Sequence, residues 1–365
     1  MKDELYYQVA LTLIPDLGPI RARLLVEHFG SASSVFKAKK KEISVIEGIG
    51  EFSARAVKNW NGFAEVDEEI LFIEKHRIQA LFISDKDYPQ RLLHCYDPPT
   101  LLYYRGNADL NSSRIISIIG TRNHTDYGKQ VTEQLVAELE AQQVLIVSGL
   151  AFGIDSIAHK ISLQHGLPTI GVLGHGLDTI YPSQNKMLAK EMVSHGGLLT
   201  EFRRNTKPDK HNFPKRNRIV AGMADATVVI ETASKGGSMI TAELACNYNR
   251  DVFAIPGRIN DHKSSGCIQL IKQNKAVLLT GAEQLAETMG WLDKKKPIKK
   301  QKELFIELTA DEKVIVNILK EKETVPIDAL YLQSGLSSSR VAAAILNLEI
   351  QSVISALPGK MYKLL

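Results

Sequence analysis

Short apolar runs alternate with longer segments of helical periodicity between residues 114 and about 290. The runs are rich in β-branched residues and carry no polar face, which is typical of strands in a parallel sheet that helices cover on both sides. We therefore predict an α/β domain with a parallel sheet in this part of the chain. The predicted strands are 115–119, 144–147, 169–173, 197–200, 227–230, 252–255 and 276–279.

The first 80 or so residues contain a repeated helical pattern. Each copy places a glycine-containing turn before a helix that carries alanine at the same offset. This pattern resembles a helix-hairpin-helix motif, in which backbone N–H groups can approach a phosphate. In the first copy Pro19 replaces the second glycine and removes an N–H donor. A helical module that only packs or binds protein is an equal alternative. The first copy has Gly18 in its turn and Ala22 in its helix, and the second copy has Gly48 and Gly50 in its turn and Ala54 in its helix.

Three further segments flank the central domain. Residues 81–113 predict a strand, a proline-rich connector and a second strand. Residues 291–303 are rich in lysine and predict a basic linker. Residues 304–365 predict three short helices and a two-stranded wing, the pattern of a winged helix. Its third helix offers only Arg340 as a basic residue, which favours a protein-interaction or regulatory module over a DNA contact.

The composition is that of an ordinary soluble protein. The 365 residues are 44% hydrophobic and 24% charged, a length that predicts two or three domains. No window approaches 18 uninterrupted apolar residues and the opening residues lack a signal-peptide pattern, so we expect a cytoplasmic protein without a membrane span. The three cysteines have unrelated spacings, which predicts neither disulfides nor a zinc site. We expect no metal and no cofactor.

Positive charge is clustered in the stretch 203–218. The net charge is only +4, but seven of these sixteen residues are Lys or Arg, against the single acid Asp209. The stretch also holds two prolines, which predict a loop, and Phe213 near its centre. Cationic groups neutralise phosphates and an aromatic ring stacks on an unpaired base, so the stretch is suited to a single-stranded nucleic acid. A solvated surface loop is the alternative.

Glycine-rich turns follow most of the predicted strands, and in a doubly wound sheet ligands bind at this carboxyl edge. Arg122 comes directly after the first of these turns and has no acidic neighbour in sequence, which favours a phosphate contact. Asp155 and Asp178 follow later turns, where N-capping is the default role. The sequence lacks the P-loop, the G-x-G-x-x-G turn, the G-x-S-x-G elbow and H-E-x-x-H, which argues against the enzyme classes that use them.

A dense set of motifs resembles the DprA/Smf family, DNA-processing protein A. The matching segments are SIIGTR (117–122), SGLAFGIDSIAH (148–159), VLGHGLDTIYPSQNKML (172–188), LLTEF (198–202), NFPKRNRIVAGMADATVVIETASKGGSMITAELA (212–245) and VFAIPG (252–257). The resemblance implies an extended Rossmann-like domain and a non-enzymatic protein that binds single-stranded DNA. It also implies that a homodimer loads RecA recombinase onto incoming DNA during natural transformation. The implied domains are 1–80 (helix-hairpin-helix or SAM-like), 81–290 (Rossmann-like, core 114–280), 291–303 (linker) and 304–365 (winged helix).

The same resemblance implies a set of DNA-binding residues. The G-T-R turn would contact a phosphate, the ring of the N-F-P-x-R-N-R segment would stack on a base, and the Gly-Gly-Ser turn would offer backbone amides. Two lysines are added because of their charge. Asn217 and Arg218 have an alternative role, attaching the stretch to the following helix. The predicted residues are Gly120, Arg122, Lys210, Phe213, Lys215, Arg216, Asn217, Arg218, Gly236, Gly237 and Ser238.

A second reading is a nucleotide-processing enzyme. The segment GGSMITAE (236–243) distantly resembles the P-G-G-x-G-T-x-x-E motif of lysine-decarboxylase-like phosphoribohydrolases, with Glu243 at the position of the glutamate. Lys235 replaces the proline, and Met239 and Ile240 replace the G-T pair. These departures make the enzyme the weaker hypothesis.

Overall fold

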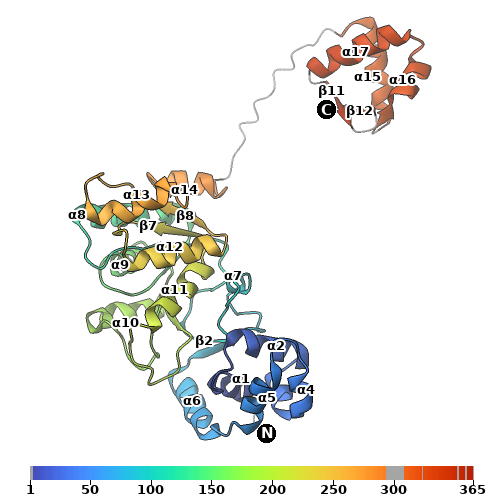
Figure 1. Cartoon of the computed structure of the whole chain (residues 1–365). Coiled ribbons are helices and arrows are strands. Elements are labelled where there is room, and N and C mark those ends of the chain that lie inside the picture. The colour runs from blue at the N-terminus through green and yellow to red at the C-terminus, as the bar shows by residue number, and fades with distance from the viewer. Residues whose placement is uncertain (1–2, 293–307, 323, 352, 358–359, 365) are drawn as a thin grey trace. The chain divides into compact units, whose positions relative to one another are not determined.

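The computed structural model describes residues 3–292, 308–322, 324–351, 353–357 and 360–364. The chain divides into two compact units, Met1–Leu292 and Asp293–Leu365 (Figure 1). From residue 293 onward, the predicted linker 291–303 lies outside the described residues. None of the helices in the described ranges is both long and apolar enough to cross a bilayer.

A nine-stranded sheet forms the centre of the larger unit, in the order β1-β2-β6-β5-β4-β3-β7-β8-β9. The seven strands from β3 to β9 are parallel to one another, which confirms the predicted parallel sheet. All seven predicted apolar runs became strands, with boundaries that differ by at most one residue. They are β3 (Ile115–Ile119), β4 (Leu145–Ser148), β5 (Thr169–Val172), β6 (Gly196–Thr200), β7 (Ala226–Val229), β8 (Asp251–Ala254) and β9 (Val277–Leu278).

Two antiparallel strands extend one side of the sheet. β2 (Leu101–Gly106) pairs with β6, and β1 (Gln79–Phe82) pairs with β2. The connector between them contains the short helix α7 (Gln90–Leu93). The strand–connector–strand prediction for 81–113 is therefore confirmed.

Helices cover both faces of the sheet, because successive strand residues point to opposite sides. Ile116 and Ile118 of β3 lie in one apolar cluster with α8, α9 and α14, while Ile115 and Ile119 lie in another with α11, α12 and α13. α10 packs on a smaller cluster that includes Leu173. The helices are α8 (Asp126–Glu138), α9 (Ile154–Gln164), α10 (Lys186–Ser194), α11 (Asn212–Met223), α12 (Gly237–Asn247), α13 (Ser265–Lys272) and α14 (Ala282–Thr288), with the 3-10 turns η1 (Leu139–Gln142), η2 (Ser183–Asn185) and η3 (His262–Ser264).

The N-terminal residues form the predicted helical module. Pro19 is the first residue of α2, where the missing N–H is tolerated because a helix start leaves that group free. Gly48 and Gly50 both have positive φ (82° and 67°), the conformation that glycine adopts most readily. The helices are α1 (Glu4–Leu13), α2 (Pro19–Phe29), α3 (Ala32–Lys37), α4 (Lys40–Ser44), α5 (Gly50–Asn59) and α6 (Phe63–His76).

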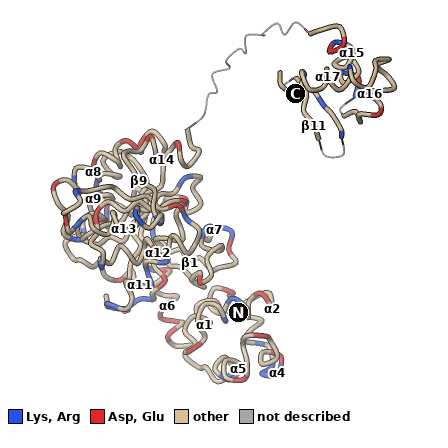
Figure 2. The backbone as a smooth tube through the Cα atoms, turned by 45° about the horizontal axis from the view of Figure 1, so that its top comes forward, with Lys and Arg blue, Asp and Glu red and all other residues tan. Residues whose placement is uncertain are grey.

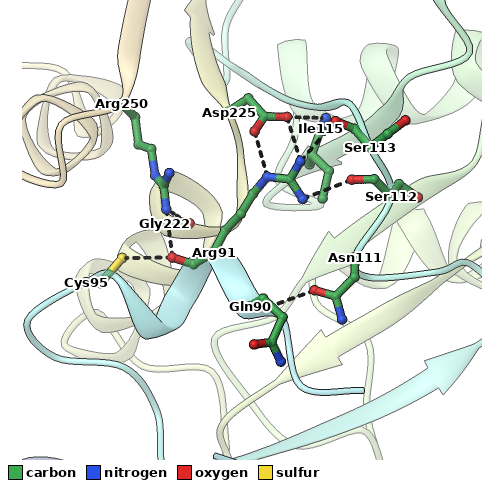
Figure 3. A network of polar contacts seen from close by, with 10 residues as sticks. All are labelled: Gln90, Arg91, Cys95, Asn111, Ser112, Ser113, Ile115, Gly222, Asp225 and Arg250. Carbon is green, nitrogen blue, oxygen red and sulfur yellow. Dashed lines mark hydrogen bonds and ion pairs between the residues drawn. The ribbon is translucent and has the colours of Figure 1, made fainter. Parts of the chain in front are cut away.

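A polar network fastens the connector to the amino edge of the sheet (Figure 3). Arg91 of α7 forms a bidentate ion pair with Asp225, which precedes β7, at 2.6 and 2.9 Å. The same carboxylate accepts a hydrogen bond from the backbone N–H of Ile115, the first residue of β3. The Arg91 guanidinium also donates to the carbonyls of Ser112 and Ser113. This edge is therefore closed by internal contacts, which leaves the opposite, carboxyl edge for a ligand.

The smaller unit has the winged-helix arrangement that the sequence predicts. Thr309 caps its first helix in a capping box with Glu312. The wing is part of a three-stranded sheet rather than a two-stranded one, because Val325 and Pro326 add a short strand. Its elements are α15 (Ala310–Lys320), β10 (Val325–Pro326), α16 (Ile327–Ser334), α17 (Ser338–Ile350), β11 (Ile354–Leu357) and β12 (Met361–Leu364).

Candidate nucleic-acid interface

A cleft of about 760 Å³ opens at the carboxyl edge of the sheet. It lies where the strand order reverses, since β4 continues the sheet on one side of β3 and β7 on the other. This switch point is the usual ligand position in an open α/β sheet. Nine of the eleven predicted residues line the cleft: Gly120, Arg122, Lys210, Phe213, Arg216, Asn217, Gly236, Gly237 and Ser238. Lys215 and Arg218 do not.

The basic stretch 203–218 differs from the continuous loop that its prolines predict. It is irregular as far as His211 and then enters α11, whose first turn contains Phe213 and Pro214. A proline in the first turn of a helix costs little, because the N–H that it lacks has no intrahelical partner there. The loop prediction is therefore wrong for residues 212–218. Figure 2 shows several Lys and Arg positions around α11.

Arg122 and Phe213 face each other across the cleft. The guanidinium carbon of Arg122 lies 5.7 Å from the centre of the Phe213 ring, within the range of a cation–π contact. Among the described residues no carboxylate forms an ion pair with Arg122, whose side chain is exposed. The Tyr181 ring also lies beside Phe213, with 6.0 Å between the ring centres. The arrangement places an available cation beside two accessible aromatic rings.

Arg216 lines the cleft with a buried side chain. It is only 5% exposed, and its Nη1 donates to the carbonyl of Val172, the last residue of β5, at 2.9 Å. A Cβ atom at Gly149 would lie 1.8 Å from that nitrogen, so the turn after β4 must have glycine to admit the guanidinium. Burial lowers the pKa of Arg216 to about 10, and the charge of Asp155 opposes this shift, so the side chain stays protonated at neutral pH.

Asp155 is a buried acidic residue and not the N-cap that the sequence suggested. Gly153 caps α9, and the Asp155 carboxylate accepts a hydrogen bond from the backbone N–H of Ala151. Burial raises the pKa of Asp155, while Arg216 acts in the opposite direction. Asp178 does not cap a helix either, since its side chain accepts a hydrogen bond from the N–H of Asn205.

The Gly-Gly-Ser segment forms the start of α12. Gly236 is the N-cap residue and no side chain caps the helix, so first-turn amides remain available to an anion. A Cβ at Gly237 would meet nothing within 4 Å, so the approach to this turn is open. Ser238 instead directs its hydroxyl to Thr232 at 2.7 Å.

Arg218 lies outside the cleft in a polar cluster of its own. It forms an ion pair with Glu201 and donates to the carbonyl of Asp97, and its side chain is only 11% exposed. The alternative role was attachment of the stretch to the following helix, but Arg218 lies within that helix, α11, and links it to Glu201 and Asp97. Lys215, which follows Pro214 on the first turn of α11, is exposed.

Two features of this region were not predicted from the sequence: the Tyr181 ring, and the ion pairs of Arg203 and Arg204. Tyr181 lies in the motif segment 172–188, and an exposed aromatic next to a proline was the available signal. The pairing of Arg203 and Arg204 with α6 had no local signal, because the partners are about 135 residues apart in sequence.

Comparisons with known proteins identify relatives along nearly the whole chain. Residues 79–290 match the family model described as DNA recombination-mediator protein A, and residues 302–360 match the DprA winged helix domain. Protein Smf of Synechocystis is 32% identical, with 98% of each chain covered. DNA processing protein DprA of Bacillus subtilis is 43% identical over 58% of this chain and 71% of its own length.

Two solved structures share the fold. The DNA processing protein A of Streptococcus pneumoniae superposes with a TM-score of 0.68 at 32% identity, covering 77% of this chain and 97% of that one. The protein of the same name from Helicobacter pylori has a TM-score of 0.53 at 32% identity, covering 59% and 97%. The Helicobacter pylori structure gives insight into the single-stranded DNA binding mode of that protein.

Proposed function

The chain belongs to the DprA/Smf family of DNA-processing proteins, and from this premise we propose that its cleft binds single-stranded DNA. The observation that carries the proposal is the Arg122 guanidinium, which has no carboxylate partner among the described residues, beside the Phe213 ring at the switch point of the sheet. We further propose that a cytoplasmic homodimer loads RecA recombinase onto the bound strand during natural transformation and recombination, without catalysing a reaction itself.

Each part of the cleft suits one part of a strand. Arg122 and Lys210 offer cations to phosphates, and the first-turn amides of α12 offer hydrogen bonds to another phosphate. Phe213 and Tyr181 offer faces on which unpaired bases can stack. Such contacts carry little base information, so we expect slight sequence preference. Duplex should bind poorly, because its bases are already stacked.

The proposal is tested by a fluorescence anisotropy titration of labelled oligothymidine at several salt concentrations, with duplex of equal length as competitor. Tight binding that weakens with salt and that duplex displaces poorly supports the cleft as a single-strand site. Absence of binding at low salt contradicts it. RecA loading is tested separately, by the rate of RecA filament assembly on the strand with and without this protein.

Replacing Phe213 by alanine is expected to weaken oligothymidine binding by about 1–3 kcal/mol, or roughly 5- to 150-fold, since a stacking platform is lost. The slope of log affinity against log salt should stay unchanged, because no phosphate contact is removed. Anisotropy titrations measure both quantities, with Phe213→Tyr as the control that keeps an aromatic ring. A reduced slope together with unchanged affinity at low salt would contradict the stacking role.

Replacing Arg122 by alanine should change the salt dependence of binding, which the Phe213 variant leaves unchanged. Affinity is expected to fall about equally for all base sequences, and the salt slope should decrease in magnitude by about 0.7, the value for one phosphate contact on a single strand. The control is Lys86→Ala, which removes the same charge from an exposed position in the connector between β1 and β2. Equal effects from both variants would show that only net charge matters.

The hydrolase hypothesis finds no support in the position of its glutamate. Glu243 is exposed on α12, does not line the cleft and forms an ion pair with Lys275 at 3.6 Å. A phosphoribohydrolase would need this carboxylate beside its substrate. Release of free base from a nucleoside monophosphate, abolished in Glu243→Ala, would reverse this assignment.

A further inference from the structure

The first two arginines of the basic stretch are held by carboxylates of the N-terminal module. Arg203 forms an ion pair with Glu65, and Arg204 forms one with Glu68. Both acids lie on α6, whose acidic residues can be followed beside the basic stretch in Figure 2. These two cations are therefore occupied by intramolecular anions, whereas Arg122 meets no carboxylate of the described residues.

The contacts with α6 are of two kinds. Glu69 is buried, with 3% of its side chain exposed. One carboxylate oxygen accepts a hydrogen bond from the backbone N–H of Arg204 at 3.2 Å, and the other lies 3.5 Å from Nε of the Arg204 guanidinium. Glu65 and Glu68 are 60% and 66% exposed and touch only the guanidinium groups. Exposed ion pairs contribute about 0–1 kcal/mol each. Glu69 thus positions both the backbone and the guanidinium of Arg204, while the two outer pairs with Glu65 and Glu68 can be exchanged at little cost.

The backbone of Arg203 and the ring of Phe213 both pack against the turn that follows β5. A Cβ at Gly174 would lie 2.9 Å from the Phe213 ring, and a Cβ at Gly176 would lie 2.5 Å from the Arg203 carbonyl. The N–H of Gly176 also donates to the carbonyl of Thr206 at 3.1 Å. The turn after β5 therefore leads from the aromatic ring in the cleft to the two arginines. A strand that left the cleft past Phe213 along this turn would reach the two arginines.

We propose that Arg203 and Arg204 extend the single-strand site beyond the cleft, and that Glu65 and Glu68 cover them until DNA phosphates displace the carboxylates. This inference rests on the proposed function of the cleft. Phosphates of a long strand can replace two weak surface pairs, because neutralising them also releases counterions from the DNA. The N-terminal module then sets how strongly the protein prefers long strands over short ones.

The test uses the full chain with Glu65→Gln and Glu68→Gln combined, which keeps side-chain shape and removes both negative charges. Anisotropy titrations use oligothymidines of about 6 and about 30 nucleotides, one that fills only the cleft and one that extends past it. We expect the double variant to bind the long strand roughly two- to tenfold more tightly than wild type. Its affinity for the short strand should stay within about twofold of wild type.

Two controls separate this mechanism from a general charge effect. Glu283→Gln with Glu287→Gln makes the same change in net charge on exposed positions of α14, away from the cleft, and should leave the preference for long strands unchanged. Adding Arg203→Gln and Arg204→Gln to the first variant should abolish its gain.

Each remaining outcome overturns the inference. If wild type binds both strands but the α6 variant shows no gain, or shows a gain that survives loss of the arginines, the arginines do not extend the site. Only a wild-type protein that binds neither strand would overturn the proposed function as well.

Discussion

Replacing Arg218 by alanine is expected to lower the free energy of unfolding by about 3 kcal/mol, since it removes one partner of a largely buried ion pair. The Glu201 side chain is only 17% exposed beside Arg218, and its Oε1 already lacks a hydrogen-bond partner among the described residues. Burial raises the pKa of Glu201, and the Arg218 charge is the main opposing influence. Without it the carboxylate would be buried uncompensated.

Urea denaturation followed by tryptophan fluorescence measures this loss, because Trp60 and Trp291 both belong to the larger unit. The double variant Arg218→Met with Glu201→Gln is the control, because it removes both charges and should recover most of the stability. At a temperature where Arg218→Ala remains folded, its salt slope for oligothymidine should equal that of wild type. A stable variant with a reduced slope would instead identify Arg218 as a phosphate contact.

Acid should destabilise the larger unit through His159, which lies fully buried on α9. Burial, followed by the nearby charge of Arg216, lowers the pKa of His159 from 6.5 to about 3. Its Nδ1 lies 2.6 Å from the hydroxyl of Thr169, and that hydroxyl donates to the carbonyl of Ile146. The neutral ring therefore carries its proton on Nδ1, and Nε2 has no partner among the described residues.

The direction of the pH effect follows from linkage. Below pH 6.5 the unfolded chain protonates His159 while the folded protein does not, so stability is lost as pH falls towards 3, by about 1.4 kcal/mol per pH unit. Between pH 6.5 and 4.5 this amounts to about 2.5 kcal/mol. The lowered pKa of His175 acts in the same direction, whereas the raised pKa values of Asp155 and Glu201 act in the opposite one.

Comparing wild type with His159→Asn isolates the histidine. Urea denaturation at a series of pH values should show a shallower loss of stability in the variant, whatever its stability at neutral pH. The readout is the difference between the two slopes, so a uniform cost of the substitution does not affect it. Parallel curves would mean that His159 titrates alike in the folded and unfolded states.

Much of the architecture could be predicted from the sequence, because it follows from local patterns. The apolar β-branched runs specify strands buried on both faces, and seven such runs between helices leave a parallel sheet as the expected arrangement. The glycine turns after those strands likewise predicted the edge at which the cleft opens. Arg122 was selected because it directly follows the first glycine turn, and Phe213 because it is the aromatic residue near the centre of the basic stretch.

Only the tertiary structure decided which cations of the basic stretch form internal contacts and which remain available to a ligand. In sequence its seven cations look alike, but their electrostatic partners come from distant segments: α6 for Arg203 and Arg204, the β5 carbonyl for Arg216, and Glu201 for Arg218. Lys210 instead lies exposed at the cleft. Whether a cation serves stability or a ligand depends on which anions the fold brings within a few ångströms, and no local pattern contains that information.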